Sequence, residues 1–372
     1  MVLLQYPGFT VLREHRFVKV LFHAPHRSLS TCAIHGGQRE DLLAFLNCQT
    51  CEGSALHPKA QTLHLLSREA MHLESCREAA LEPGTTAQMG TAANMDYVAV
   101  REANYEDARV SAIVTAGVEG NAGRAGDPAQ WHEGSQGYQA VHAVPGTINI
   151  ILLFHQSLSP AALARSAVTM TEAKSAALQD LAVGSRYSSG LATGTGTDQF
   201  AIASPLALEA RFHWTGKHAK LGELVGTTVK EAVLEALRWQ NGFEPSRTRS
   251  LFHALGRFGL REEAFKGHVE RIIQDEGQRK FLQDCTTMLS NDPRCSASAY
   301  ALAAVLDRQK AGVLPSGSAR DAVALQCALL ACAVSGKNEK FSQYLAQMQA
   351  CHEVFPDGLI MAIYLGWRDK WC

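Results

Sequence analysis

The residues best suited to chemistry lie in the middle of the chain, beginning with a Gly-rich run, TAGVEGNAGRAGD, at Thr115–Asp127. Glycines let backbone N–H groups approach a ligand closely. The polar side chains of the run are those of Asn121, Arg124 and Asp127. A surface loop rich in turn residues has a similar composition, so the run by itself is only a candidate binding loop.

A carboxamide, Asn149, interrupts an otherwise apolar, strand-like run, GTINIILLF, at residues 146–154. If the side chain is buried, each polar group left without a partner costs about 1 to 3 kcal/mol. The amide therefore either bonds to neighbouring backbone or presents a hydrogen-bonding group to a ligand or an oxyanion. Thr147 is a candidate for substrate binding in the same run.

Glu172 and Lys174 belong to an alanine-rich helical stretch, TMTEAKSAALQDL. They are two residues apart, so they do not face each other on a helix. An exposed helix surface often carries such charges, but the alanines indicate tight packing. A partly enclosed Glu172 would have its pKa raised by desolvation and could act as a general base.

The loop at residues 193–198, TGTGTD, carries hydroxyls and a carboxylate between glycines. It lacks the GxxxxGK[ST] pattern of a phosphate-binding loop, which argues against nucleotide binding. Thr195 and Thr197 would bind the polar edge of a substrate, or a threonine would act as a nucleophile if a base lay beside it. Asp198 and, further along, His218 are further candidate catalytic groups.

Strands and helices are interspersed up to about residue 240. Alternating or continuous apolar patterns predict strands at residues 10–13, 17–22, 29–34, 97–102, 109–116, 146–154 and 200–203. Helical spacing predicts helices at residues 41–47, 67–80, 159–181 and 221–237. We therefore expect an α+β fold in which a mixed or antiparallel sheet is covered by helices.

The composition changes after the segment NGFEP at residues 241–245, and nearly everything beyond it has helical spacing. We place a domain boundary at about residue 245. It separates a catalytic domain, residues 1–244, from an all-helical domain, residues 245–372. The helical domain would dock a partner, join copies of the chain in a homo-oligomer, or add packing mass.

The charge balance argues against two classes of partner. With 35 basic and 36 acidic residues the formal net charge is −1, and no basic stripe stands out. Neither nucleic acid nor a membrane surface is therefore indicated. The first residues do not form a signal peptide, and no apolar run approaches the ~18 residues of a membrane span. We expect a soluble, cytoplasmic protein.

The ten cysteines are scattered, and without an export signal they are expected to be reduced and mostly buried. Cys48 and Cys51 form a CxxC pair, but no second pair at suitable spacing completes a zinc site. A zinc ion held by Asp127, Asp198 and His218 stays open as an alternative, so the need for a metal is uncertain.

Several motifs occur in a fixed order: STCAIHGG with Asn47, VTAGVEGNAGRAGDP, GTINIILL, TMTEAKSAALQDL, SGLATGTGTDQFAIA and WTGKHAKLGELVGTTVKEAV. Over about residues 20–240 this order resembles the adenosylcobinamide amidohydrolase family of corrinoid salvage. The family-like positions are Gly36, Gly37, Asn47, Thr115, Asn121, Arg124, Asp127, Asn149, Glu172, Lys174, Thr195, Thr197, Asp198, His218 and Glu223.

The resemblance implies hydrolysis of the amide bond between aminopropanol and the corrin ring of adenosylcobinamide, which gives adenosylcobyric acid. The substrate carries its own cobalt, so no cofactor is required of the protein. Amide hydrolysis needs an activated nucleophile and a stabilised oxyanion. We assign Glu172 as the base that activates water, with a threonine of the 193–198 loop as the alternative. Asn149 or Asn121 would hold the oxyanion.

The leaving amine also needs a proton, which Lys174 or His218 would supply. The remaining positions would bind the corrinoid. The rival interpretation is a corrinoid-binding protein without catalysis, acting with an uptake or remodelling system.

Overall fold

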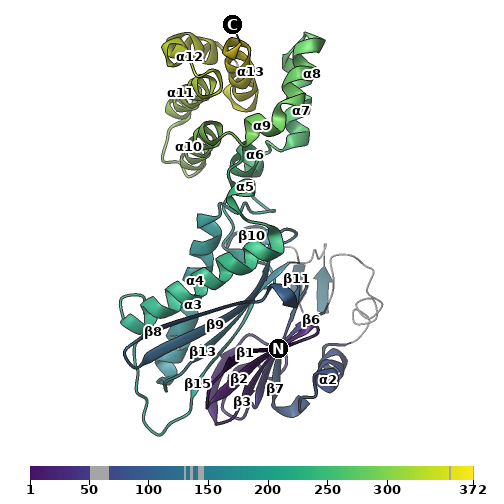
Figure 1. Cartoon of the computed structure of the whole chain (residues 1–372), viewed down its shortest axis with the longest axis vertical. Helices are drawn as coiled ribbons and strands as arrows, with labels where there is room; N and C mark the ends of the chain where they lie inside the picture. Colours follow the sequence, from purple (N-terminus) through teal and green to yellow (C-terminus); the bar gives the residue numbers. More distant parts are fainter. Residues whose placement is uncertain (51–66, 130, 135–136, 141–145, 352, 372) are drawn as a thin grey trace. The chain divides into compact units, whose positions relative to one another are not determined.

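The computed structural model of the chain describes residues 1–50, 67–129, 131–134, 137–140, 146–351 and 353–371 (Figure 1). The chain divides into two compact units, Met1–Phe243 and Glu244–Cys372. The first unit contains all of the candidate site residues.

One large sheet of the first unit, called the first sheet below, has the strand order β1-β2-β3-β6-β7. Its strands are β1 (Val2–Gln5), β2 (Phe9–Glu14), β3 (Phe17–Phe22), β6 (Ala44–Gln49) and β7 (Thr86–Thr91). Neighbouring strands are antiparallel except for the parallel pair β6–β7. Helix α2 (Arg68–Ala79) covers the outer face, where its Cys76 packs with Leu46 and Cys48.

The other large sheet, called the second sheet, has the order β5-β4-β15-β13-β9-β8. Its strands are β4 (His26–Ser30), β5 (Gly37–Arg39), β8 (Ala99–Tyr105), β9 (Ala108–Gly117), β13 (Thr147–Phe154) and β15 (Gln199–Pro205). Strands β13 and β15 are parallel, and helix α3 (Pro160–Asp180) connects them. Helix α4 (Lys220–Asn241) lies beside α3 against the same sheet (Figure 1).

The two large sheets pack face to face, and side chains alternate between the two faces of each strand. On β13, Ile150 and Leu152 pack under α3 and α4, whereas Ile151 and Leu153 face the first sheet. The layers therefore follow the order α2, first sheet, second sheet, α3 with α4. The predicted α+β class, with mixed sheets covered by helices, is confirmed, although the prediction did not separate two sheets.

The helix predicted at residues 41–47 is wrong, because this segment leads into strand β6 (Ala44–Gln49). Phe45 packs between the two sheets, and Leu46 packs beneath α2. Both faces of β6 are buried, so its sequence, AFLNCQ, has apolar residues on both faces and lacks the alternation that marks a half-exposed strand.

Two short pairings complete the first unit. Strand β10 (Ala122–Gly123) pairs with β14 (Gly194–Thr195), and β11 (Trp131–Gly134) pairs with β12 (Gly137–Ala140). The first pairing joins the Gly-rich run directly to the TGTGTD loop. Helix α3 begins as predicted, since the Ser159 hydroxyl accepts from the backbone N–H of Ala162 and Pro160 holds the first position.

The second unit is helical in its described part, as predicted. Its α-helices are α5 (Pro245–Thr248), α6 (Leu251–Leu255), α7 (Glu262–Ile272), α8 (Glu276–Asp284), α9 (Thr286–Ser290), α10 (Pro293–Lys310), α11 (Ser316–Ser335), α12 (Phe341–Ala350) and α13 (Leu359–Lys370). Among the described helices, α11 is long and apolar enough to cross a membrane, and half of that stretch is buried within the unit. The core helix of a globular unit meets the same criterion.

Candidate active site

Most of the candidate residues gather at one end of the sandwich. Gly117, the last residue of β9, pairs with Thr147, the first residue of β13. Asn149 pairs in parallel with Gln199, which begins β15. The Gly-rich run and the TGTGTD loop join these strand ends, so both reach the same place. We call this the loop end.

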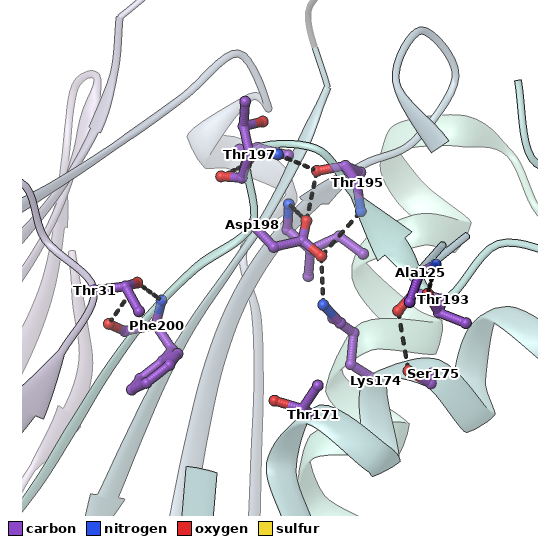
Figure 2. A network of polar contacts seen from close by, with 12 residues as sticks. Thr31, Ala125, Thr171, Lys174, Ser175, Thr193, Thr195, Thr197, Asp198 and Phe200 are labelled. Carbon is purple, nitrogen blue, oxygen red and sulfur yellow. Dashed lines mark hydrogen bonds and ion pairs between the residues drawn. The ribbon is translucent and has the colours of Figure 1, made fainter. Parts of the chain in front are cut away.

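Asp198 is the centre of a polar network at the loop end. Figure 2 shows Lys174 reaching from α3 to the Asp198 carboxylate, with Nζ 2.5 Å from Oδ2. The Thr195 hydroxyl donates to Oδ1 at 2.6 Å, and its backbone N–H donates to Oδ2 at 3.0 Å. The backbone N–H of Ile148 donates to Oδ1 at 2.9 Å. The carboxylate thus ties α3, β13 and the TGTGTD loop together.

The environment of this ion pair makes it strong. The side chains of Lys174 and Asp198 are only 12% and 14% exposed. Charged pairs shielded from water interact more strongly than surface pairs, and each partner is costly to leave alone. Because both its hydroxyl and its backbone N–H donate to this carboxylate, Thr195 is held in a fixed position by Asp198.

The hydroxyls and amide of the loop end brace one another. Thr147 Oγ1 donates to the Thr197 carbonyl at 2.6 Å, and Thr197 Oγ1 donates to the Gly146 carbonyl at 2.7 Å. Asn121 Nδ2 donates to the same Gly146 carbonyl at 3.2 Å. The hydroxyl of Tyr187 donates to Asn121 Oδ1 at 2.7 Å. Tyr187 was not among the predicted residues, and nothing local in the sequence marks it.

Arg124 and Asp127 close the Gly-rich run. The backbone N–H of Arg124 and the Ser185 hydroxyl donate to Asp127 Oδ2 at 2.7 and 2.5 Å. Burial raises the pKa of Asp127, but the hydrogen bonds from serine and from Arg124 outweigh it and lower the pKa below its usual value. The Arg124 guanidinium donates to the Leu191 carbonyl at 3.1 Å. Both residues shape the loop.

A buried chain of side-chain amides links the two sheets just inside the loop end. Asn149 Nδ2 donates to Asn47 Oδ1 at 2.8 Å, and Asn47 Nδ2 donates to Thr115 Oγ1 at 2.8 Å. Asn149 Nδ2 also donates to the Gly90 carbonyl at 3.0 Å. Asn47, Thr115 and Asn149 are 2%, 1% and 0% exposed. Residues from three strands therefore form one polar layer inside the sandwich.

The strand predicted at 29–34 ends at Ser30, and a turn at residues 33–35 follows it. Gly36 comes directly after this turn, and Gly37 begins β5. A Cβ on Gly36 would lie 2.0 Å from the Cys32 carbonyl oxygen, which no rotamer can relieve. Gly37 has a φ of +78°, in the region that favours glycine. Both positions need glycine for the turn itself.

Glu172, Glu223 and His218 lie apart from the loop end. The Glu172 carboxylate is 45% exposed and pairs with Lys217 at 3.0 Å. It lines an open groove of about 960 Å³ between α3 and α4, together with Glu223, which pairs with Lys220. His218 is exposed in the segment before α4. The predicted general base thus faces a different region from Lys174.

The predicted CxxC pair is only half described, since Cys51 lies outside the described residues. Cys48 is fully buried, and burial raises the pKa of its thiol to about 11, although Arg16 donates to Sγ at 2.7 Å. The described residues contain no group of three or more His, Cys, Asp or Glu placed to hold a metal ion. Asp127, Asp198 and His218 accordingly form no ligand set there.

Two comparisons relate this chain to known proteins. An uncharacterized protein of Methanocaldococcus jannaschii is 39% identical over 160 residues, which cover 41% of this chain and 62% of that protein. The chain thus matches less than two thirds of that relative's length. The adenosylcobinamide amidohydrolase family pattern matches residues 5–245. This match spans nearly all of the first unit, whose strand ends bring the motifs together, and the chain belongs to the adenosylcobinamide amidohydrolase family.

Proposed function

We propose that the chain hydrolyses the amide bond between aminopropanol and the corrin ring of adenosylcobinamide, giving adenosylcobyric acid and free aminopropanol. The family supports amide hydrolysis as the class of reaction. The substrate and the bond are inferred from the family description.

The observation that carries the proposal is the buried amide layer of Asn47, Thr115 and Asn149 beside the Asp198 network. The two are coupled within β13, because Ile148 bonds to Asp198 through its backbone and the next residue, Asn149, points between the sheets. A neutral amide is held by hydrogen bonds more than by charge. This layer supplies such groups next to a rigid, charged loop.

Hydrolysis adds water across the amide. The water oxygen bonds to the carbonyl carbon, the C–N bond breaks, and the departing amine gains a proton. The Thr195 hydroxyl donates to Asp198, so its oxygen would accept a hydrogen bond from the attacking water and orient it. Lys174 holds the loop in place through its ion pair with Asp198, which favours a preorganised site. Glu172, the base expected from the sequence, lies on the far side of α3 and pairs with Lys217, so we propose no direct role for it in the reaction.

The test is incubation of the full chain with adenosylcobinamide, followed by mass spectrometry for adenosylcobyric acid and aminopropanol. We expect both products from the purified protein and neither from heat-denatured protein. A parallel sample dialysed against a chelator should be equally active if no metal takes part. Tight corrinoid binding without release of aminopropanol would contradict the proposal and support the corrinoid-binding interpretation.

A further inference from the structure

We infer that Asn149 acts as a hydrogen-bond acceptor whose Oδ1 receives the N–H of the scissile amide, and that it does not donate to the oxyanion. This inference rests on the proposed function and concerns the orientation of the substrate arm. It follows from which atoms of the amide layer are already occupied.

The orientation of the Asn149 amide is fixed by its neighbours. The Gly90 carbonyl can only accept, so the Asn149 atom that faces it at 3.0 Å must be Nδ2. The second Nδ2 proton goes to Asn47 Oδ1 at 2.8 Å. Both donor positions are therefore used, and none is left for a developing oxyanion.

Asn47 and Gly90 are themselves held in place. Asn47 presents Oδ1 to Asn149, so its Nδ2 points to the Thr115 hydroxyl. The backbone N–H of Gly90 donates to Gln199 Oε1 at 3.0 Å. A rotation of the Asn149 amide would place Oδ1 against two acceptors, which is unfavourable. Contacts between the two sheets thus fix the direction in which Asn149 Oδ1 points.

That oxygen has no partner within the described part of the chain. Asn149 Oδ1 is buried and accepts no hydrogen bond, although the residue is 0% exposed. A buried carbonyl oxygen normally has a donor, from the protein or from a bound molecule. An unmatched acceptor beside the Asp198 network therefore predicts a donor in the complex.

A secondary amide supplies such a donor. Its nitrogen carries one N–H, and the hydrolysis product adenosylcobyric acid has a carboxyl group there instead. Since Oδ1 is enclosed, neighbouring groups must move for a ligand to reach it, and the linear aminopropanol arm requires a smaller movement than the corrin ring. The acceptor would align the amide plane against the loop end and hold the nitrogen as it becomes an amine.

The experiment compares adenosylcobinamide with its ester analogue, in which oxygen replaces the scissile N–H. We expect Asn149→Leu to lower kcat/KM for the amide about tenfold more than for the ester, because only the amide loses a hydrogen bond. Thr115→Val is the matched control, since it removes a hydroxyl from the same layer without touching Oδ1. It should affect both substrates equally. An unchanged amide-to-ester ratio in Asn149→Leu would overturn the inference.

Binding provides a readout that does not depend on turnover. The Asn149→Leu variant should bind adenosylcobinamide more weakly than the wild type does, while the two proteins should bind adenosylcobyric acid equally well. If the wild type binds adenosylcobinamide but does not cleave it, the proposed function fails and this selective loss still tests the acceptor. Equal loss for both corrinoids, as expected if a bound water fills the position, would refute it. Failure to bind either corrinoid would overturn both proposals.

Discussion

Glu172 and Lys174, two residues apart on α3, form ion pairs on different sides of the helix. Glu172 Oε2 lies 3.0 Å from Lys217 Nζ at the α3–α4 groove, and Lys174 Nζ lies 2.5 Å from Asp198 Oδ2 at the loop end. A separation of two residues turns the helix by about 200°. The two charged groups therefore lie in different parts of the protein, as their spacing predicted.

This separation allows the Asp198 network, held by Lys174, and Glu172 at the groove to be tested independently. We expect Lys174→Met to lower turnover of adenosylcobinamide by at least about tenfold, because it releases Asp198 and the loop that holds Thr195. Glu172→Gln should change turnover less than about threefold, since Glu172 is half exposed and paired only at the groove. Steady-state kinetics on both variants decides the matter. A tenfold loss of turnover in Glu172→Gln alone would show instead that Glu172, at the groove, is the general base.

Asp198→Asn should destabilise the first unit by about 3 kcal/mol, because it leaves the buried Lys174 ammonium without its counter-charge. Hydrogen exchange of the β13 amides measures this free energy in the full chain. Asp180→Asn is the matched control, since Asp180 pairs with Lys230 where the two side chains are 52% and 39% exposed. It should cost less than about 1 kcal/mol. Equal costs would show that burial adds nothing to the Lys174–Asp198 pair.

Gly194→Ala should disrupt the same network by steric contact. A Cβ on Gly194 would lie 2.3 Å from Asp198 Oδ2 and 2.7 Å from Lys174 Nζ, so the ion pair would have to separate. We expect a loss of turnover similar to that of Lys174→Met. Gly226→Ala, with no atom within 4 Å of its Cβ, is the control and should remain active. An active Gly194→Ala protein would show that the ion pair is dispensable.

A second polar cluster, away from the loop end, predicts a pH dependence of stability. Burial lowers the pKa of His155 to about 4; Glu102 opposes this shift and Arg109 adds to it. His155 Nε2 lies 2.8 Å from the Ser111 hydroxyl, which donates to Glu102 at 2.5 Å. The histidine must therefore supply the proton of its own contact with Ser111, and it does so in the neutral form.

The unfolded chain binds a proton at His155 near pH 6.5, whereas the folded chain binds it only near pH 4. Stability should therefore fall as pH drops from about 6.5 to about 4, by at most about 3 kcal/mol from this residue. Hydrogen exchange of β9 amides across this range measures the effect. His155→Gln should reduce the slope, and His213→Gln, an exposed histidine, should not. A wild-type slope in His155→Gln would contradict the assignment.

The sequence predicted elements that have an unbroken apolar run or a capped end. Helix α3 follows from Ser159–Pro160 and its apolar stripe, and β13 from its apolar run. Strands β6 and β7 lie between α2 and the second sheet. They were misread or missed because polar residues, such as Asn47 and Gln88, interrupt their apolar runs. A strand in that position loses the period-two pattern that distinguishes it from a buried helix.

The candidate site was predictable only as a set of residue types. Asn149 stood out as an amide in an apolar run, but its partner Asn47 lies on the other sheet, and Gly90 contributes a backbone carbonyl that no residue type reveals. Tyr187 joins through Asn121 for the same reason. Such contacts depend on how the sheets pack, which local patterns do not encode.

The contact between Asn47 and Asn149 joins residues 102 positions apart in the chain. Closing so long a loop is entropically costly, so contacts of this kind tend to form late in folding. Neither sheet can complete the amide layer alone. During refolding, secondary structure should thus recover before corrinoid affinity. The delay between the two would measure how long one sheet takes to dock onto the other.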